Sequence, residues 1–366
     1  MAAMLINRPT GLLCFLSATA GITPSLSKVG RRDIFAMANL LRSRNLHSNN
    51  SNHDYTIGRL QKPQCGRHYS TTTTPTTTNK DSAVSLTYTH IKPTKPPAAA
   101  KLLAPMIVMH GLFGSKQNWG AMSKAISNSL GIEVYAVDLR NHGDSPHQHP
   151  HTYEAMSLDI EKFMNDHNIA GKAIILGHSM GGKVAMNFAL TYPSKVHSLI
   201  VDDMSPVHYP LSGDFRAYTR ALKEIEKAGV KSQKEADQML QKYEKDLGIR
   251  QFLLTNMKKQ SQQSGGYVCR VPLDIIDESI ENMGKWPTVP PPSTNTSSSM
   301  GEDTRQYVGP TLFISGAKSS YIQPKYYPDI EKYFPNSDIE TLDTGHWVHA
   351  EKPNEFLELV KNFLTQ

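Results

Sequence analysis

Cysteine is scarce in this chain of 366 residues, which contains only Cys14, Cys65 and Cys269. Two of the three lie in the first 69 residues, so the remainder holds one thiol and cannot form an internal disulfide. No group of cysteines and histidines has the spacing of a zinc site, and we predict neither a metal nor a bound cofactor. No apolar run reaches the roughly 18 residues that a transmembrane helix needs.

A general excess of positive charge is also missing, although the formal net charge is +6. The segment up to Tyr69 holds nine Lys or Arg and two acidic residues, which leaves 30 basic and 31 acidic residues for the rest. The basic character therefore belongs to the N-terminal segment. This balance gives no support to a nucleic-acid-binding body, and no nucleic-acid partner is predicted.

Residues 1–69 have the composition of a mitochondrial presequence, because they are rich in Arg, Ser and Asn and have no acidic residue before Asp33. Arg67-His68-Tyr69-Ser70 resembles a matrix-peptidase site and predicts cleavage after Tyr69, with the mitochondrial import and processing machinery as partners. A secretory signal is the competing interpretation, since an apolar run over residues 11–20 ends in Ala-Thr-Ala. The many Arg beyond that run and the lack of a disulfide framework favour the mitochondrion.

Residues 70–84 are rich in Thr and predict a disordered linker, and residues 85–366 then alternate strands with helices. Strands are expected at 106–109, 134–137, 173–176, 198–201, 312–314 and 339–342. Helices are expected at 119–129, 154–165, 180–192 and 354–363. This alternation predicts an α/β fold with a mostly parallel, doubly wound sheet.

The interval from about residue 210 to residue 286 interrupts the alternation with charged, helical sequence. We predict that it forms a helical cap inserted after the sixth strand, with helices at 217–227, 234–247 and 249–258. Residues 287–303 are rich in Pro, Ser and Thr and lack core-forming side chains. They predict a flexible loop that leads back to the sheet.

Gly177-His178-Ser179-Met180-Gly181 follows one of the predicted strands and precedes a helix. Gly-x-Ser-x-Gly in this setting is typical of the turn that exposes a nucleophilic serine. A serine hydroxyl is a poor nucleophile and needs a base. His346 and His349 both follow the last predicted strand, and His346 is preferred because Gly345 can turn the chain and aim it across the strand ends.

The acid that orients this base is expected at the end of the strand before the cap, which finishes with Asp202-Asp203. Strand alternation would send these two side chains to opposite sides, so only one can serve; Asp203 is our choice, with Asp202 structural. The loop at residues 316–321, which follows the next predicted strand, has no carboxylate.

An oxyanion site needs backbone N–H groups close to the serine, and His110-Gly-Leu-Phe-Gly follows an early strand. We expect the N–H groups of Leu112 and Met180 to provide it, with His110 bracing the loop. The segment 138–146 is expected to buttress the site, and residues 115–119 to line the pocket or cap a helix.

Taken together, the segments that begin at His110, Asp138, Gly177, Val201 and Gly345 resemble the α/β-hydrolase superfamily over residues 85–366. The combination is most similar to the mitochondrial abhydrolase-domain esterases, small bacterial acyl-CoA esterases and yeast ethanol acetyltransferases. In that group the acid stands 24 residues beyond the serine, as Asp203 does beyond Ser179. Two segments depart from the pattern, the insertion at 287–303 and the loop at 318–320, and neither is expected to touch the triad.

The resemblance implies an enzyme with Ser179 as nucleophile, His346 as base and Asp203 as acid. It would transfer the acyl group of an ester or an acyl-CoA thioester, such as acetyl-CoA, to water or to an alcohol, with ethyl acetate as one product. The alternatives are a hydrolase without alcohol acyltransferase activity, a peptidase or lyase on the same fold, and a non-enzymatic scaffold. An intact Ser, Asp and His in the expected order argues against the scaffold.

Overall fold

The computed structural model describes residues 83–94, 104–169, 171–211, 213–260, 265–286 and 303–366. The predicted presequence with its cleavage site, most of the linker and nearly all of the loop at 287–303 lie outside these residues. The linker prediction reaches too far, because Val84 is only 6% exposed and its N–H donates to the Asp159 carboxylate at 2.8 Å. The packed domain therefore includes this residue.

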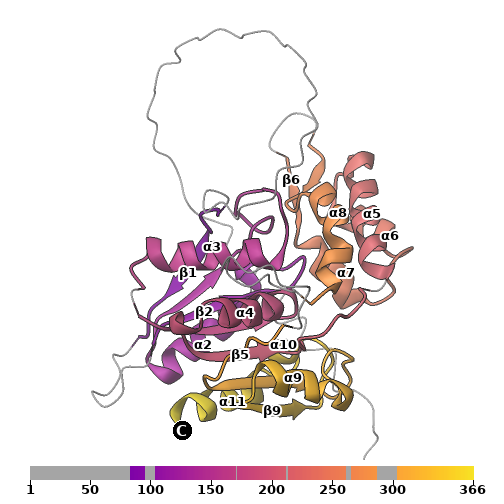
Figure 1. Cartoon of the computed structure of the whole chain (residues 1–366). Coiled ribbons are helices and arrows are strands. Elements are labelled where there is room, and N and C mark those ends of the chain that lie inside the picture. Colours follow the sequence, from indigo (N-terminus) through magenta and orange to yellow (C-terminus); the bar gives the residue numbers. More distant parts are fainter. Residues whose placement is uncertain (1–82, 95–103, 170, 212, 261–264, 287–302) are drawn as a thin grey trace, which may run out of the picture. The chain divides into compact units, whose positions relative to one another are not determined.

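A seven-stranded sheet forms the centre of the domain, with strand order β1-β3-β2-β4-β5-β8-β9 (Figure 1). All neighbours pair in parallel except β1 and β3, which are antiparallel. The strands are β1 (Tyr88–Ile91), β2 (Met106–Met109), β3 (Val134–Val137), β4 (Ala173–His178), β5 (Val196–Asp202), β8 (Thr311–Gly316) and β9 (Ser337–Leu342). This confirms the predicted mostly parallel α/β sheet; β1 was not predicted, since its largely exposed side chains give little apolar signal.

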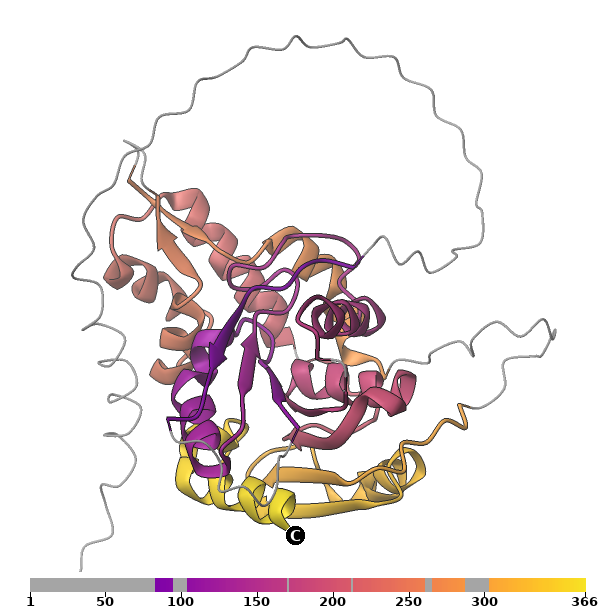
Figure 2. The same ribbon diagram turned by 90° about the vertical axis from the view of Figure 1, so that its left-hand side faces the viewer.

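Helices cover both faces of the sheet (Figure 2). Strand residues alternate between two apolar clusters, as the period of two requires: in β2, Ile107 and Met109 belong to one cluster and Met106 and Val108 to the other. The first cluster includes α3 (Tyr153–Asp166), α4 (Met180–Thr191) and α9 (Tyr327–Tyr333). The second includes α2 (Gly120–Leu130), α10 (Val348–Glu351) and α11 (Pro353–Thr365).

Short 3₁₀ helices connect several of these elements. They are η2 (Lys116–Trp119), η3 (Pro193–Lys195) and η4 (Pro324–Tyr326). Within the described ranges, no helix combines the length and the apolar character needed to cross a bilayer.

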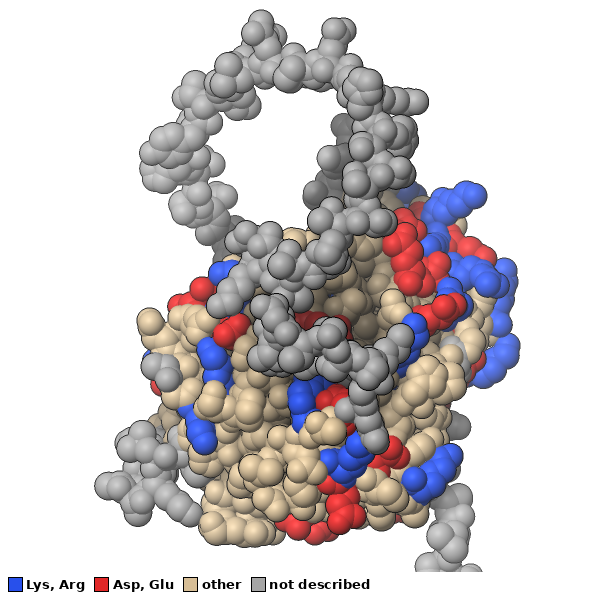
Figure 3. Space-filling model, in the orientation of Figure 1, with Lys and Arg blue, Asp and Glu red and all other residues tan. Residues whose placement is uncertain are grey.

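The cap lies between β5 and β8 in the sequence, so it follows the fifth strand of the chain and not the sixth. It consists of α5 (Gly213–Ala228), α6 (Gln233–Leu240), α7 (Leu247–Leu254), the hairpin strands β6 (Met257–Lys259) and β7 (Tyr267–Cys269), and α8 (Leu273–Gly284). Lys and Arg alternate with Asp and Glu over its outer face (Figure 3). Arg216 pairs with Glu281, and Lys223 with Asp274, so this face is a solvated, charge-balanced surface.

Two of the predicted cap helices end several residues earlier in the structure. The helix expected at 234–247 ends at Leu240, because the Asp246 side chain accepts the N–H of Ile249 at 2.9 Å and starts a new helix. The helix expected at 249–258 ends at Leu254, because Met257 pairs with Cys269 in the β6–β7 hairpin. Neither this hairpin nor α8 was predicted.

Candidate active site

Ser179 occupies the sharp turn between β4 and α4, with backbone angles φ 54° and ψ −116°. A positive φ is costly for a residue with a side chain and is found where the surrounding structure enforces it. The flanking glycines explain how the turn closes: a Cβ on Gly177 would lie 2.1 Å from the Gly181 carbonyl oxygen, and one on Gly181 would lie 2.6 Å from the Met109 carbonyl oxygen. The sequence therefore places the Ser179 hydroxyl at the N-terminal end of α4.

Asp203 and His346 form a direct pair, with the His346 Nδ1 atom donating to Asp203 Oδ2 at 2.6 Å. The Asp203 side chain is fully buried, whereas that of His346 is 20% exposed. β5 ends at Asp202, and Asp203 has φ 50° just beyond the strand. The turn after β5, and not strand alternation, thus sends Asp203 toward His346.

Two further donors hold the Asp203 carboxylate. The Gly316 N–H donates to Oδ1 at 3.0 Å, and the Ser319 hydroxyl donates to Oδ2. The prediction that the loop at 318–320 does not touch the triad is therefore wrong. The sequence of that loop contains no carboxylate, but the loop supplies a hydroxyl donor to Asp203, which follows the neighbouring strand β5.

Asp202 binds a different histidine: its Oδ2 accepts from His349 Nδ1 at 2.5 Å, and both side chains are buried. Burial raises the pKa of Asp202, and the charge of His349 opposes this rise. Trp119 stacks on the His349 ring at 4.1 Å between ring centroids. Asp202 and His349 therefore have the structural positions expected of them.

His178, Asp202 and His349 form a buried cluster whose possible ligand atoms lie within 4.8 Å of one another. The contact of 2.5 Å between His349 and Asp202 is a hydrogen-bond distance. Two ligands that share a zinc ion at about 2.0–2.1 Å lie farther apart than this. The cluster as built is therefore explained by hydrogen bonding.

His178 connects the serine turn to the histidine loop. Its Nε2 donates to the His346 carbonyl oxygen at 2.9 Å, and the two ring centroids are 4.7 Å apart. Burial lowers the pKa of His178 well below its usual value, and the nearby His346 and His349 lower it further. A neutral His178 next to Ser179 thus anchors the backbone that carries His346.

The predicted oxyanion loop follows β2, and Leu112 and Met180 line one pocket with Ser179. Phe113 has φ 61°, and its N–H donates to His142 Nε2 at 3.1 Å. Its carbonyl oxygen accepts from Asn256 of the cap at 2.8 Å. The loop is therefore fixed from both the sheet and the cap.

The remaining polar loops act as supports, as predicted. His110 Nε2 accepts from the Leu139 N–H at 3.0 Å, which braces the oxyanion loop against the segment after β3. Arg140 of that segment pairs with the buried Asp159 at 2.6 Å. Lys116 pairs with Asp138, and Ser115 caps η2.

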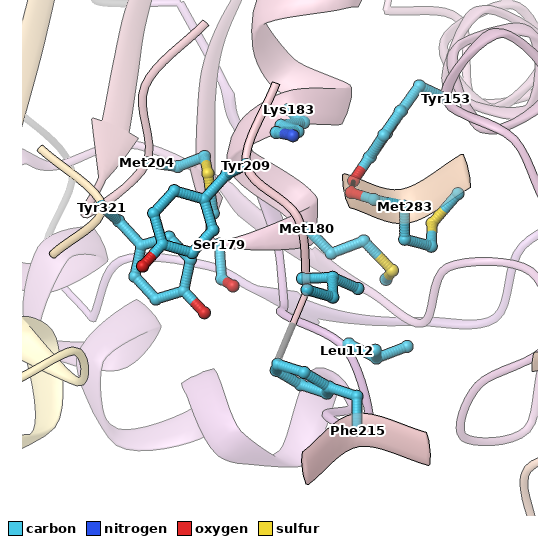
Figure 4. Close-up of a pocket in the computed structure, with 11 residues that line it drawn as sticks. Leu112, Tyr153, Ser179, Met180, Lys183, Met204, Tyr209, Phe215, Met283 and Tyr321 are labelled. Atoms are coloured by element: carbon cyan, nitrogen blue, oxygen red, sulfur yellow. Dashed lines mark hydrogen bonds between the residues drawn. The ribbon is translucent and has the colours of Figure 1, made fainter. Parts of the chain in front are cut away.

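The pocket above Ser179 holds about 340 Å³ of space between atoms, part of it open to solvent. Figure 4 shows its lining: apart from the serine, the sheet domain contributes Leu112, Tyr153, Met180, Lys183, Met204 and Tyr321. The segment leading into the cap and the cap itself contribute Tyr209, Leu211, Phe215 and Met283. A small, mostly apolar pocket next to the Ser179 hydroxyl is suited to an acyl group.

The Tyr321 ring lies 4.3 Å from the His346 ring, measured between centroids. Burial raises the pKa of Tyr321 to about 12, so its hydroxyl stays protonated at neutral pH. Sequence reasoning missed Tyr321, as it missed Ser319, His178, Asn256 and Lys183. None of these residues has a spacing signal, since each acts through a partner distant in the sequence.

A model of the alpha/beta hydrolase fold family matches residues 104–353. The chain therefore belongs to this family, as the motifs predicted. An abhydrolase domain-containing protein of Schizosaccharomyces pombe is 42% identical over 260 residues, which cover 71% of this chain and 92% of that protein.

Two further relatives have names that describe an activity. The sn-1-specific diacylglycerol lipase ABHD11 of Danio rerio is 37% identical over 265 residues, covering 71% of this chain and 78% of the lipase. A probable alcohol acetyltransferase of Saccharomyces cerevisiae is 35% identical over 274 residues, covering 71% of this chain and 77% of its own length.

Among solved structures, a marine microorganism esterase is similar with a TM-score of 0.64 and 32% identity, covering 77% of this chain and 100% of that structure. These relatives place the chain in the branch that the sequence predicted. They also support the prediction of an enzyme that acts on esters.

Proposed function

We propose that this protein is a serine-dependent acyl transfer enzyme that takes the acyl group of an ester or an acyl-CoA thioester. The observation that carries the proposal is the position of Ser179 in the sharp turn between β4 and α4. Next to this turn lies the loop that carries His346, whose imidazole is bound to the buried carboxylate of Asp203. His178 donates to the His346 carbonyl oxygen at 2.9 Å, and this bond holds the loop against the serine turn. This combination supports a nucleophile, a base and an orienting acid in one constellation.

In the proposed reaction, the Ser179 oxygen attacks the acyl carbonyl carbon while His346 takes the hydroxyl proton. Asp203 stabilises the imidazolium that forms. The N–H groups of Leu112 and Met180 bind the oxyanion, and the loss of one such donor typically lowers the rate by about 10²–10³. His346 then returns the proton to the leaving alcohol or thiol, which leaves an acyl-enzyme at Ser179.

Water or an alcohol completes the reaction by attacking the acyl-enzyme, with His346 again as base. Transfer to water gives a free acid, and transfer to ethanol gives an ethyl ester. The acyltransferase branch is supported by the similarity to the probable alcohol acetyltransferase and to ethanol acetyltransferases of Cyberlindnera fabianii and Hanseniaspora uvarum. The hydrolytic branch is supported by the similarity to the lipase and the esterase.

The first test is covalent labelling of the full chain with a fluorophosphonate probe. We expect the wild type to be labelled and Ser179→Ala to remain unlabelled, with Ser205→Ala as a serine control that keeps its labelling. Equal labelling of Ser179→Ala and the wild type would refute the assignment of the nucleophile. Incubation with acetyl-CoA, with and without ethanol, then measures ethyl acetate against free acetate and separates the two branches.

The same proposal places the enzyme in the mitochondrion, on the basis of the Arg-rich, acid-poor composition of residues 1–69. The test is expression of a C-terminally tagged chain, followed by cell fractionation and N-terminal sequencing of the mature protein. A mitochondrial product that begins at Ser70 is the expected result. A product that begins near Gly21 would indicate secretion instead.

A further inference from the structure

Three side chains from different elements line the pocket and are nearly fully buried. They are Tyr153 of α3, Lys183 of α4 and Met283 of the cap helix α8, and we call them the end wall (Figure 4). Lys183 stands one helical turn beyond Ser179 on α4. It brings an amino group into a lining that is otherwise mostly apolar.

Hydrogen bonds fix the end wall to the last residues of α8. Lys183 Nζ donates to the carbonyl oxygens of Gly284 and Lys285, each at 3.0 Å, and the Tyr153 hydroxyl donates to the Met283 carbonyl oxygen at 2.6 Å. The final carbonyls of a helix lack partners within the helix. These donors satisfy them and join the cap to α3 and to α4, the helix that follows the serine.

Displacing Lys183 from this position is costly. The residue is only 2% exposed, and burial lowers its pKa to about 7. Among the described residues, no carboxylate forms an ion pair with it; its contacts are the two carbonyl oxygens and the Tyr153 ring, 5.7 Å from Nζ. Leaving a buried donor or acceptor unpaired destabilises the folded protein.

We propose that Lys183 is a specificity-determining residue that restricts the acyl group to short chains by closing the pocket at the end wall. The inference rests on the proposed function, because it needs the acyl group to be bound next to Ser179. An acyl chain that extends from Ser179 to the end wall meets the Lys183 amino group and the Tyr153 hydroxyl. A longer alkyl chain must break their hydrogen bonds and place methylene groups against buried polar groups.

The test compares kcat/KM of the full chain for p-nitrophenyl acetate, butanoate, hexanoate and octanoate. For the wild type we expect the acetate or the butanoate to be preferred over the octanoate. Lys183→Met keeps a side chain of similar length but removes the donors, and it should raise the octanoate-to-acetate ratio by roughly tenfold. Met283→Ala enlarges the pocket at the same wall and keeps the hydrogen bonds of the wall. It should shift the ratio in the same direction.

Lys285→Met is the matched control, because the Lys285 side chain is exposed while its carbonyl oxygen is the acceptor. This variant should keep the wild-type ratio. Met283→Ala also keeps the inference testable if Lys183→Met does not fold, which circular dichroism and thermal unfolding reveal.

The inference is overturned if Lys183→Met and Met283→Ala lower kcat/KM for all four esters by the same factor, because that pattern indicates a purely structural role. A wild type that prefers the octanoate overturns it as well. Failure of the proposed function looks different: in that case, the fluorophosphonate probe does not label Ser179. A labelled enzyme whose chain-length preference does not move rejects the end-wall role alone.

Discussion

Two aspartates that are neighbours in the sequence, Asp202 and Asp203, each bind a histidine, but the two pairs have different surroundings. The Asp203–His346 pair has one partly exposed member, and Tyr321 of the pocket lies against its imidazole. The Asp202–His349 pair is enclosed on both sides, with Trp119 stacked on the histidine. The same two functional groups thus form one pair that a substrate can reach and one that it cannot.

The two pairs are alike in their hydrogen bonding and differ in their position relative to the pocket. Both pairs have short charge-assisted contacts, of 2.6 Å and 2.5 Å. A general base must lie within reach of the proton that it removes, so geometry decides before pKa does. Under the proposed function, His346 is this base, because His178 bonds its loop to the serine turn, whereas the Asp202–His349 pair is buried.

We call Asp203–His346 the outer pair and Asp202–His349 the inner pair. The largest effect is expected from a substitution that breaks the outer pair. Asp203→Asn removes the charge that stabilises the imidazolium and allows the wrong tautomer of His346. We expect kcat for a p-nitrophenyl ester to fall by about 10⁴. If kcat stays within tenfold of the wild type, Asp203 is not the acid of the proposed triad.

The same substitution in the inner pair should act on stability. Asp202→Asn removes a buried negative charge from a neighbouring histidine, and breaking a buried pair costs about 3–5 kcal/mol of unfolding free energy. We expect chemical denaturation to report a loss near the lower end of that range, because the amide oxygen can still accept from His349. A fall in kcat as large as that of Asp203→Asn, without loss of stability, would exchange the assigned roles of the two aspartates.

Local sequence patterns were sufficient for the serine turn and for every strand of the sheet except β1. Continuous apolar runs coincide with β2 and β3, and the glycines at 177 and 181 are required by contacts with nearby backbone. Asp203 was chosen at the end of the strand before the cap, and the family resemblance agreed with this choice, but the physical reason for its direction differs from the predicted alternation. The Asp203 side chain is directed by a left-handed turn beyond the strand, which no periodicity describes.

The rest of the site depends on contacts that no local pattern encodes. His178 and His346 are 168 residues apart in the sequence, Asn256 and Phe113 are 143 apart, and Ser319 and Asp203 are 116 apart. Each contact requires that the sheet and the cap are already assembled. The cap itself was predicted as a helical region, but its internal breaks depend on single capping and pairing events, such as the one at Asp246.

The smallest effect is expected for a substitution of Ser319. This residue donates a hydrogen bond to the outer pair, and the described residues provide no matching donor to the inner pair. The Asp203 carboxylate accepts from Gly316, Ser319 and His346, whereas Asp202 Oδ1 is a buried oxygen for which the described residues provide no hydrogen-bond donor. Ser319→Ala removes one of the three donors and leaves the other two to hold the carboxylate in place.

One hydrogen bond to a charged group contributes about 1.5–3 kcal/mol, and part of this loss is recovered by the remaining donors. We therefore expect kcat to fall by roughly tenfold, far less than for Asp203→Asn, with KM nearly unchanged. Ser320→Ala is the matched control in the same loop, since its hydroxyl bonds Tyr209 at 2.7 Å and not the acid. If Ser320→Ala lowers kcat as much as Ser319→Ala does, the loop acts through its overall conformation and not through the hydrogen bond to Asp203.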